Sequence, residues 1–243
     1  MAGLAVVMVA LGIVGCIWGA MQKYRAGRIA KTPFVKTGDA AQQGLAVAGE
    51  KGAISFEGSV KAPGLLTAPV SGKPCHFYSY KVIASWKDGD SSVEKVLDES
   101  RLGSALLVDD GTGAVRVEIS EEGDFDMSTS FNEEKKAGLV GSIKGDELVF
   151  GNLRVTTRTV PLGAKFKVEE RILAPQDKLF VCGRVAEQGT SVVAPKWASL
   201  ILSNKNRDAL LGHSVKQSKY FLMGGGAATA AGAVMGVVAN LVH

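Results

Sequence analysis

The chain has 243 residues, of which 46% are hydrophobic, and carries a formal net charge of +4 with three cysteines. This length suits one domain with additional segments, and so few cysteines exclude a disulfide framework. The surplus basic residues gather beside two apolar segments at the chain ends. We therefore do not expect the basic groove of a nucleic-acid-binding protein.

The first apolar segment covers residues 2–21 and contains no charged side chain. At about 1.5 Å of rise per residue, a helix of this length crosses the roughly 30 Å hydrocarbon core of a bilayer. No basic residue precedes the segment, as a cleaved signal peptide would require. The sequence therefore predicts a transmembrane helix that stays in place.

A short helix is expected over residues 37–48, and the chain after it has the features of a β protein. Short runs of alternating or β-branched residues recur between Gly-, Pro- and Asp-rich turns, which is typical of a barrel or sandwich. The stretch 121–138 has no clear period and is expected to be a surface excursion. We predict a mainly β fold: an antiparallel, OB-like or barrel-like domain over residues 32–212. The predicted strands cover residues 53–61, 75–86, 104–110, 114–120, 147–151, 153–160, 165–173, 178–187 and 197–203.

The second apolar segment covers residues 220–242, is also uncharged and is predicted to be a C-terminal transmembrane helix. Basic residues flank both segments on the side of the central domain, and such residues prefer the cytoplasmic side. We therefore expect an integral protein of the bacterial inner membrane, in contact with lipid, whose domain is cytoplasmic rather than periplasmic. The basic residues are Lys23, Arg25, Arg28, Lys31, Lys205, Arg207, Lys216 and Lys219.

Small residues recur at intervals of four in both apolar segments. Such spacing places small side chains on one helix face and lets helix backbones approach closely in lipid. We expect the two helices to pack on each other or on other copies, which favours a homo-oligomer. The residues are Gly15 and Gly19 in the first segment and Gly224, Ala228, Gly232 and Gly236 in the second.

Cys75 stands beside His76, which raises the question of a nucleophile with its base. Neighbours on a regular strand point to opposite faces, so these two cannot form a hydrogen-bonded dyad. We expect one to face the core and the other solvent. Cys75 and Cys182 could in principle pair, but both are interpreted as free and buried. No ligand pairs for zinc occur, and we predict no catalytic, cofactor or metal residue.

The order of these features resembles the GIDE domain family, also called the BAM (beside-a-membrane) domain. The resemblance implies a β-rich domain between two membrane spans and a structural role for the corner that leads into the strand at Cys75. Its most specific part is carried by Gly52, Gly58, Val60, Leu66, Ala68, Pro69, Ser71, Gly72, Pro74 and Cys75.

The best-known relatives are mitochondrial membrane-anchored ubiquitin ligases, in which a RING follows the second span. No RING follows here, so we expect a prokaryotic-type member without ligase activity. In those relatives the domain faces the intermembrane space, whereas the flanking charges here favour the cytoplasm.

The expected function is a non-catalytic interaction or self-assembly module beside a membrane, with a protein partner of unknown identity. Two alternatives stay open. One is a pore-forming or envelope-stress effector in which the helices of many copies form a ring. The other is a thiol-dependent enzyme at Cys75.

Overall fold

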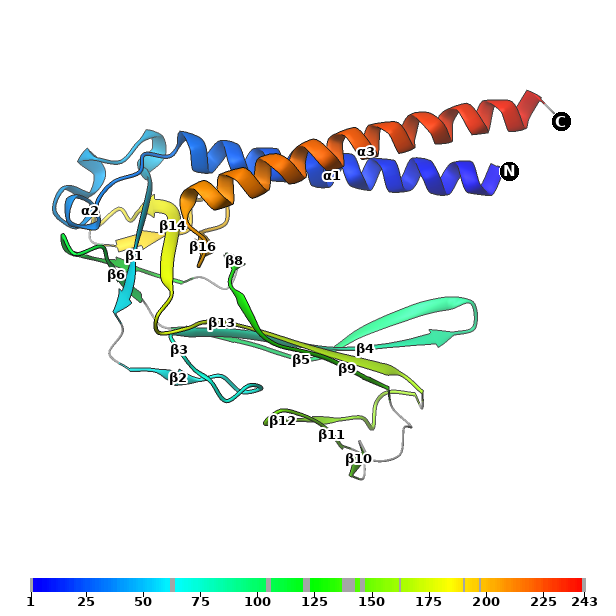
Figure 1. Ribbon diagram of the computed structural model, residues 1–243, viewed down its shortest axis with the longest axis horizontal. Coiled ribbons are helices and arrows are strands. Elements are labelled where there is room, and N and C mark those ends of the chain that lie inside the picture. The colour runs from blue at the N-terminus through cyan, green and yellow to red at the C-terminus, as the bar shows by residue number, and fades with distance from the viewer. Residues whose placement is uncertain are drawn as a thin grey trace. The chain divides into compact units, whose positions relative to one another are not determined.

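The computed structural model divides into two units, each described by itself (Figure 1). The helical unit contains α1 (Ala2–Lys31) and α3 (Arg207–Leu241), and the β unit is Phe34–Lys205. The structure describes residues 2–61, 64–103, 106–119, 123–136, 143–144, 147–161, 163–189, 191–196 and 198–241.

Helices α1 and α3 pack against each other in antiparallel orientation, so that both chain ends lie at the same end of the helical unit (Figure 1). In the described part of the chain, one helix, over Gly3–Lys31, is long and apolar enough to cross a membrane. This agrees with the predicted first span, although the helix continues beyond residue 21.

The second span predicted over 220–242 is not supported. Residues 220–241 do belong to a helix, since α3 runs without a break from Arg207 to Leu241. Within the described part of α3 no stretch is long and apolar enough to qualify as a span, and the first turns of the helix carry charged and polar side chains.

Five of the described strands close into a barrel in the order β1-β6-β7-β15-β14 and back to β1. The interior of the barrel is filled by apolar side chains, among them Ile54, Phe56, Leu106 and Val181. Two further strands, β16 and β8, extend the sheet from β14. These strands are β1 (Ala53–Lys61), β6 (Leu106–Asp109), β7 (Ala114–Val117), β8 (Asp124–Asp126), β14 (Lys178–Val185), β15 (Ser191–Val193) and β16 (Ile201–Ser203).

The expectation of a purely antiparallel domain is wrong, because β15 pairs with β7, and β16 with β8, in parallel. Tight hairpin turns force antiparallel pairing only on strands that follow one another closely. Both parallel pairs join strands separated by more than 70 residues, and a connection of that length lets a strand enter from either side.

A second sheet has the order β5-β4-β13-β9 and is formed by the chain between the barrel strands. The expectation that 121–138 is a surface excursion is wrong, since this stretch supplies β8 and β9. Strand β5 had not been predicted either. The strands are β4 (Phe77–Asp88), β5 (Ser91–Leu102), β9 (Ser128–Lys136) and β13 (Lys165–Leu173).

Smaller elements complete the β unit. The predicted helix near residue 37 is present as α2 (Thr37–Gln43), followed by two 3-10 turns, Gly44–Ala46 and Glu50–Gly52. The remaining strands are β2 (Leu66–Thr67), β3 (Pro74–Cys75), β10 (Ile143–Lys144), β11 (Glu147–Phe150) and β12 (Leu153–Thr156).

The two faces of the second sheet differ in chemistry because side chains alternate along each strand. On β13, Phe166 and Val168 face a core shared with Leu148 and Phe150 of β11. Lys167, Glu169 and Arg171 alternate with them and face the opposite way. The second sheet therefore has one covered face and one polar face, which we call the outer face.

Candidate functional site

The corner from Ala68 to Cys75, the most specific part of the family resemblance, is held by backbone hydrogen bonds. The amide of Gly72 donates to the carbonyl of Ala68, and the amide of Ala68 donates to the carbonyl of Lys73, both at 2.9 Å. Gly72 has a φ of +70°, which disfavours a side chain. Pro69 and Pro74 lie at the two sides of this turn, and the resulting hairpin pairs β2 with β3.

A buried carboxylate that sequence reasoning missed anchors this corner to the second sheet. Glu170 of β13 has no exposed surface. Its carboxylate accepts hydrogen bonds from the amides of Val70 (2.7 Å) and Ser71 (3.1 Å) and from the hydroxyl of Ser130 (2.7 Å). Burying a charge is costly unless donors surround it, so these three donors explain how β13 tolerates Glu170. The sequence offered one signal for this site: Glu170 is an acidic residue on a strand face that otherwise carries Phe166, Val168 and Ile172.

The close approach of two strands explains Gly58. Gly58 pairs with Leu179 of β14, and the next residue, Ser59, is where β1 begins to pair with β6. A Cβ atom at Gly58 would lie 2.7–2.9 Å from the backbone of Asp109, which is too close for any side chain. A glycine at this position is therefore a packing requirement of the barrel.

Cys75 and His76 are both buried, so the expectation that one of them faces solvent is wrong. The regular strand is interrupted between them: β3 ends at Cys75 and β4 begins at Phe77. Burial raises the pKa of the Cys75 thiol to about 11, and the nearby Glu170 carboxylate adds to the shift. Burial also lowers the pKa of His76. Cys75 is thus a protonated core thiol at neutral pH, and no disulfide joins it to the equally buried Cys182.

A second polar cluster ties the start of α2 to the turn between β6 and β7. The backbone amide and the hydroxyl of Thr37 donate to the carboxylate of Asp110, at 3.2 and 2.7 Å. The amide of Asp110 donates to the Thr37 hydroxyl, and the amide of Gly38 donates to the Thr112 hydroxyl. Hydrogen bonds from Thr112 and Thr37 hold the pKa of Asp110 well below its usual range. The DDGTG stretch, residues 109–113, thus acts as a clasp between α2 and the β6–β7 turn.

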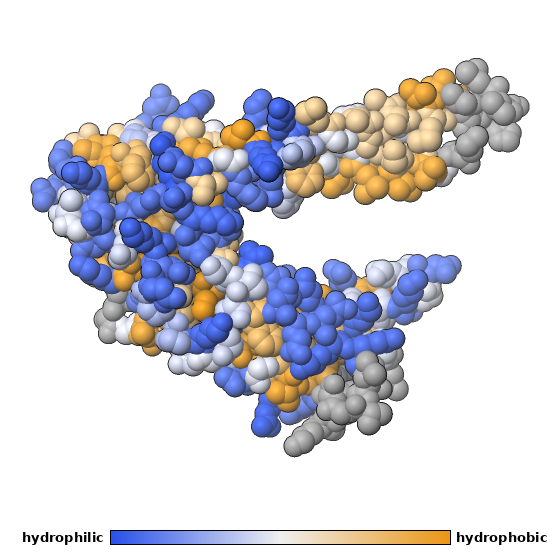
Figure 2. All heavy atoms as spheres, in the orientation of Figure 1, coloured by the Kyte–Doolittle hydropathy of each residue, from blue (hydrophilic) through white to orange (hydrophobic). Residues whose placement is uncertain are grey.

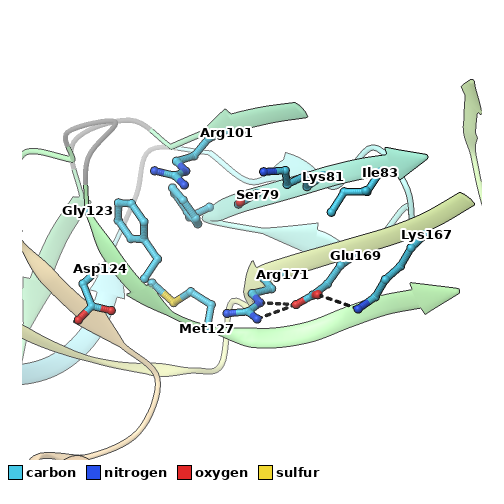
Figure 3. A pocket seen from close by; sticks show the side chains of 12 residues that line it. Ser79, Lys81, Ile83, Arg101, Gly123, Asp124, Met127, Lys167, Glu169 and Arg171 are labelled. Carbon is cyan, nitrogen blue, oxygen red and sulfur yellow. Dashed lines mark hydrogen bonds and ion pairs between the residues drawn. The ribbon is translucent and has the colours of Figure 1, made fainter. Parts of the chain in front are cut away.

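The outer face of the second sheet carries a cavity of about 370 Å³, which we call the outer-face cavity (Figure 3). At one end it is covered by β8 and by Met127, the residue that follows this strand. The cavity lies within the size range of ordinary small-molecule sites. Its lining consists of Phe77, Ser79, Lys81, Ile83, Arg101, Gly123, Asp124, Phe125, Met127, Lys167, Glu169 and Arg171.

Two aromatic rings form the apolar end of the outer-face cavity. The rings of Phe77 and Phe125 stack with centroids 4.9 Å apart, and the guanidinium of Arg101 lies 4.9 Å from the centroid of Phe125. Phe77 is fully buried, whereas Phe125 is partly exposed. Phe77 is therefore core, and Phe125 supplies the ring surface that a ligand could touch.

The polar end of the cavity is organised by ion pairs on β13. Glu169 accepts from both Nε and an Nη of Arg171, at 2.7 and 2.6 Å, and Lys167 Nζ lies 4.0 Å from it (Figure 3). On β4, Lys81 Nζ is 3.6 Å from Glu99 of β5, and both side chains are largely exposed. Exposed pairs of this kind contribute little to stability, so Lys81 is available to a ligand.

The predicted helix-packing residues fall into three groups. Gly15, Gly19 and Gly232 lie in the contact between α1 and α3: a Cβ at Gly19 would meet Leu222, and one at Gly232 would meet Val9. Ala228 is partly buried, whereas a Cβ at Gly224 would meet nothing within 4 Å. The surroundings of Gly236 lie outside the described residues. Gly225 and Gly12, which the interval of four had not selected, are both buried in the contact.

Comparison with known proteins places the chain in one family. The family model GIDE, described as E3 ubiquitin ligase, matches residues 92–238. This range is more than half of the chain, and the protein belongs to the GIDE family. No curated protein and no solved structure matched the chain. Among the residues that the structure describes, no three His, Cys, Asp or Glu side chains gather in a way that could hold a metal ion.

Proposed function

We propose that this chain is a membrane-anchored, non-catalytic binding module, in which the helical unit holds the protein in a bilayer and the β unit binds a partner. The observation that carries the proposal is the exposed apolar surface of α1. Leu4, Val6, Leu11, Val14 and Ile17 each expose more than half of their surface. Such a continuous apolar surface is unfavourable in water and is matched by lipid chains.

The distribution of charge along the helical unit supports an anchored arrangement. Figure 2 shows apolar colours toward the chain ends of α1 and α3 and hydrophilic residues toward the other end. At that other end Arg207 donates to the carbonyls of Ile29 and Ala30, at 3.2 and 3.3 Å. Basic residues from both helices thus share one end, as expected for a pair that crosses a membrane with that end in the cytoplasm. In this proposal α3 crosses beside α1.

The β unit supports a binding role. Counted along the chain, the third and fifth strands of the barrel are β7 and β15, which pair in parallel. This gives the closed barrel an OB-like strand order, and OB-like barrels are widely used as binding scaffolds. The outer-face cavity adds a concave, mixed polar and apolar surface. The thiol of Cys75, protonated and in the core, argues against the thiol-dependent alternative. Ligase activity is not part of the proposal, although the family description names it.

Self-association is the second part of the proposal. Gly225 and Gly232 pack against α1 of the same chain, so another copy would have to use a neighbouring face of α3, where a Cβ at Gly224 would meet nothing within 4 Å. Substituting Gly224→Leu should reduce the oligomer size in detergent without changing thermal stability. An unchanged size would exclude this face.

Extraction of membranes with alkaline carbonate tests the anchoring. The full chain should stay with the membrane pellet. Alkaline carbonate breaks the contacts that hold peripheral proteins, but it does not extract a helix that is inserted in the bilayer. A peripheral protein of known behaviour is the control that must be released. Recovery of this chain in the supernatant would overturn the proposal.

A further inference from the structure

The outer-face cavity contains more positive than negative charge. Lys81, Arg101, Lys167 and Arg171 line it against Asp124 and Glu169, which leaves a surplus of two positive charges among the lining residues. Glu99, which lies 3.6 Å from Lys81, is not part of the lining, and its side chain is largely exposed. Glu169 is already neutralised by Arg171 and Lys167. The cavity is therefore complementary to a ligand with about two negative charges.

The positive charges come from opposite sides of the cavity. Lys81 of β4 and Arg101 of β5 form one side, and Lys167 and Arg171 of β13 form the other. Strands β4 and β13 are direct neighbours, with Lys81 opposite Glu169 in the register. A compact anion placed over these strands could be reached from both sides, and the planar guanidinium groups suit phosphate oxygens in paired hydrogen bonds.

The apolar end adds a second requirement for the ligand. Phe125 and Met127 border the cavity at this end, and the partly exposed Phe125 ring lies under Arg101. An inorganic anion would leave these surfaces in contact with water. A ligand that joins its anionic group to an apolar body would cover them and gain the corresponding burial energy.

We propose that the outer-face cavity binds a phosphomonoester attached to an apolar body. A phosphomonoester carries about −1.5 to −2 charges at neutral pH, which matches the surplus of positive charge, whereas a phosphodiester or a single carboxylate carries one. This inference rests on the proposed function, since it names the ligand class of the binding module. The same chemistry occurs in the headgroup of a phosphatidic-acid-type lipid and in soluble aryl or alkyl phosphates.

The test is calorimetric titration of the full chain, held in nanodiscs of phosphatidylcholine, with phenyl phosphate as the probe. Inorganic phosphate and neutral phenyl glucoside serve as the two half-ligands, and empty nanodiscs give the background. Phenyl phosphate should bind at least about tenfold more tightly than either half-ligand, since it alone engages both ends of the cavity. Equal affinity for phenyl phosphate and phenyl glucoside overturns the proposal.

Substitutions locate the binding. Lys81→Met and Arg101→Met should each weaken phenyl phosphate binding by about tenfold, as expected for the loss of one charge-assisted contact. Lys95→Met is the matched control: it is an exposed lysine on the same β4–β5 hairpin, but it pairs with Ala84, whose side chain faces the covered side. An affinity loss of the same size in the control, or none in the two cavity variants, contradicts the assignment.

The source of the phosphomonoester is tested by repeating the titration in nanodiscs that contain phosphatidic acid or, at equal mole fraction, the phosphodiester phosphatidylglycerol. If phenyl phosphate binds more weakly only in the nanodiscs with phosphatidic acid, that lipid competes for the cavity and the ligand is a lipid. If phenyl phosphate binds equally in both kinds of nanodisc, the ligand is soluble. Both outcomes support the proposal. Anchoring is read separately from the carbonate extraction. An anchored chain that fails to bind phenyl phosphate overturns this inference and leaves the anchoring intact.

Discussion

At the scale of single residues, two carboxylates decide how the β unit is held together. Glu170 is buried and accepts three hydrogen bonds from the corner and from β9. Asp110 lies at the surface and ties α2 to the β6–β7 turn. The corner between β2 and β3 is shaped so that its backbone presents two amides, those of Val70 and Ser71, to Glu170.

Replacing Glu170 by glutamine should destabilise the β unit by about 2 kcal/mol. The amide group keeps the shape but can satisfy fewer of the three donors, and its own NH₂ would face Val70, Ser71 or Ser130. Urea unfolding followed by tryptophan fluorescence measures the change. Glu169→Gln, the next residue on the same strand but on the outer face, is the control and should cost less than about 1 kcal/mol. Equal losses for the two variants would contradict the anchoring role.

The Asp110 clasp predicts a dependence of stability on pH. Its pKa is depressed in the folded state, so the unfolded chain binds more protons at acidic pH and the stabilisation is present above the unfolded pKa of about 3.8. As the pH falls below that value, this contribution is progressively lost. Asp110→Asn should therefore be less stable than the unmodified protein at pH 7, by about 1 kcal/mol given the exposure of the site, and the difference should shrink toward pH 3. A difference that does not change with pH would exclude the carboxylate as its cause.

At the scale of elements, the contact between α1 and α3 repeats every seven residues. Ala5, Gly12, Gly19 and Ala26 are buried on α1, and Ser218, Gly225 and Gly232 are buried on α3. An interval of seven stays on one face of a helix, whereas repeated intervals of four drift around it by about 40° each. This drift is why Gly232 lies in the contact while Gly224 does not.

The prediction that follows compares two adjacent glycines. Gly225→Leu should lower the melting temperature of the detergent-solubilised protein, because a Cβ at this position lies 2.7 Å from the carbonyl of Gly12 and 2.8 Å from the amide of Cys16. Gly224→Leu should leave it within about 2 °C, since nothing lies within 4 Å. Both variants gain the same helix propensity, so the difference reports the packing alone. Similar melting temperatures for the two variants would mean that the helices do not pack in this register.

How well the sequence predicts the structure differs from one element to the next. The first helix, the β6–β7 hairpin and most strands were predicted because their periodicity or turn residues are local signals. Strand β5 was missed because it is an edge strand whose side chains are mostly polar and exposed, and β9 because its partner β13 lies far along the chain. The outer-face cavity is formed where β4, β5, β8 and β13 come together, and no local sequence pattern indicates that these strands meet. Glu170 was visible in the sequence, but its donors lie about 40 and 100 residues away.

At the scale of the whole molecule, the chain passes between its two units twice, between Lys31 and Phe34 and between Lys205 and Arg207. Both connections start at the end of the helical unit where the basic residues lie. If α1 crosses a membrane, the β unit must therefore lie on the side of that basic end, and the N-terminal end of α1 on the other side. The charges predict that the β unit is in the cytoplasm.

Two single cysteines test this topology in intact cells with a membrane-impermeant maleimide. Asp88→Cys lies at the exposed end of β4, and Gly3→Cys lies at the opposite end of α1 from the basic residues. Gly3→Cys should be labelled in intact cells, and Asp88→Cys only after lysis. The unmodified protein, which keeps Cys16, Cys75 and Cys182, gives the background. It should be low because Cys75 and Cys182 are buried, burial keeps the Cys75 thiol protonated, and Cys16 lies within the apolar stretch of α1. Labelling of Asp88→Cys without lysis would place the β unit outside the cytoplasm, and labelling of both sites in intact cells would show that α1 does not cross the membrane.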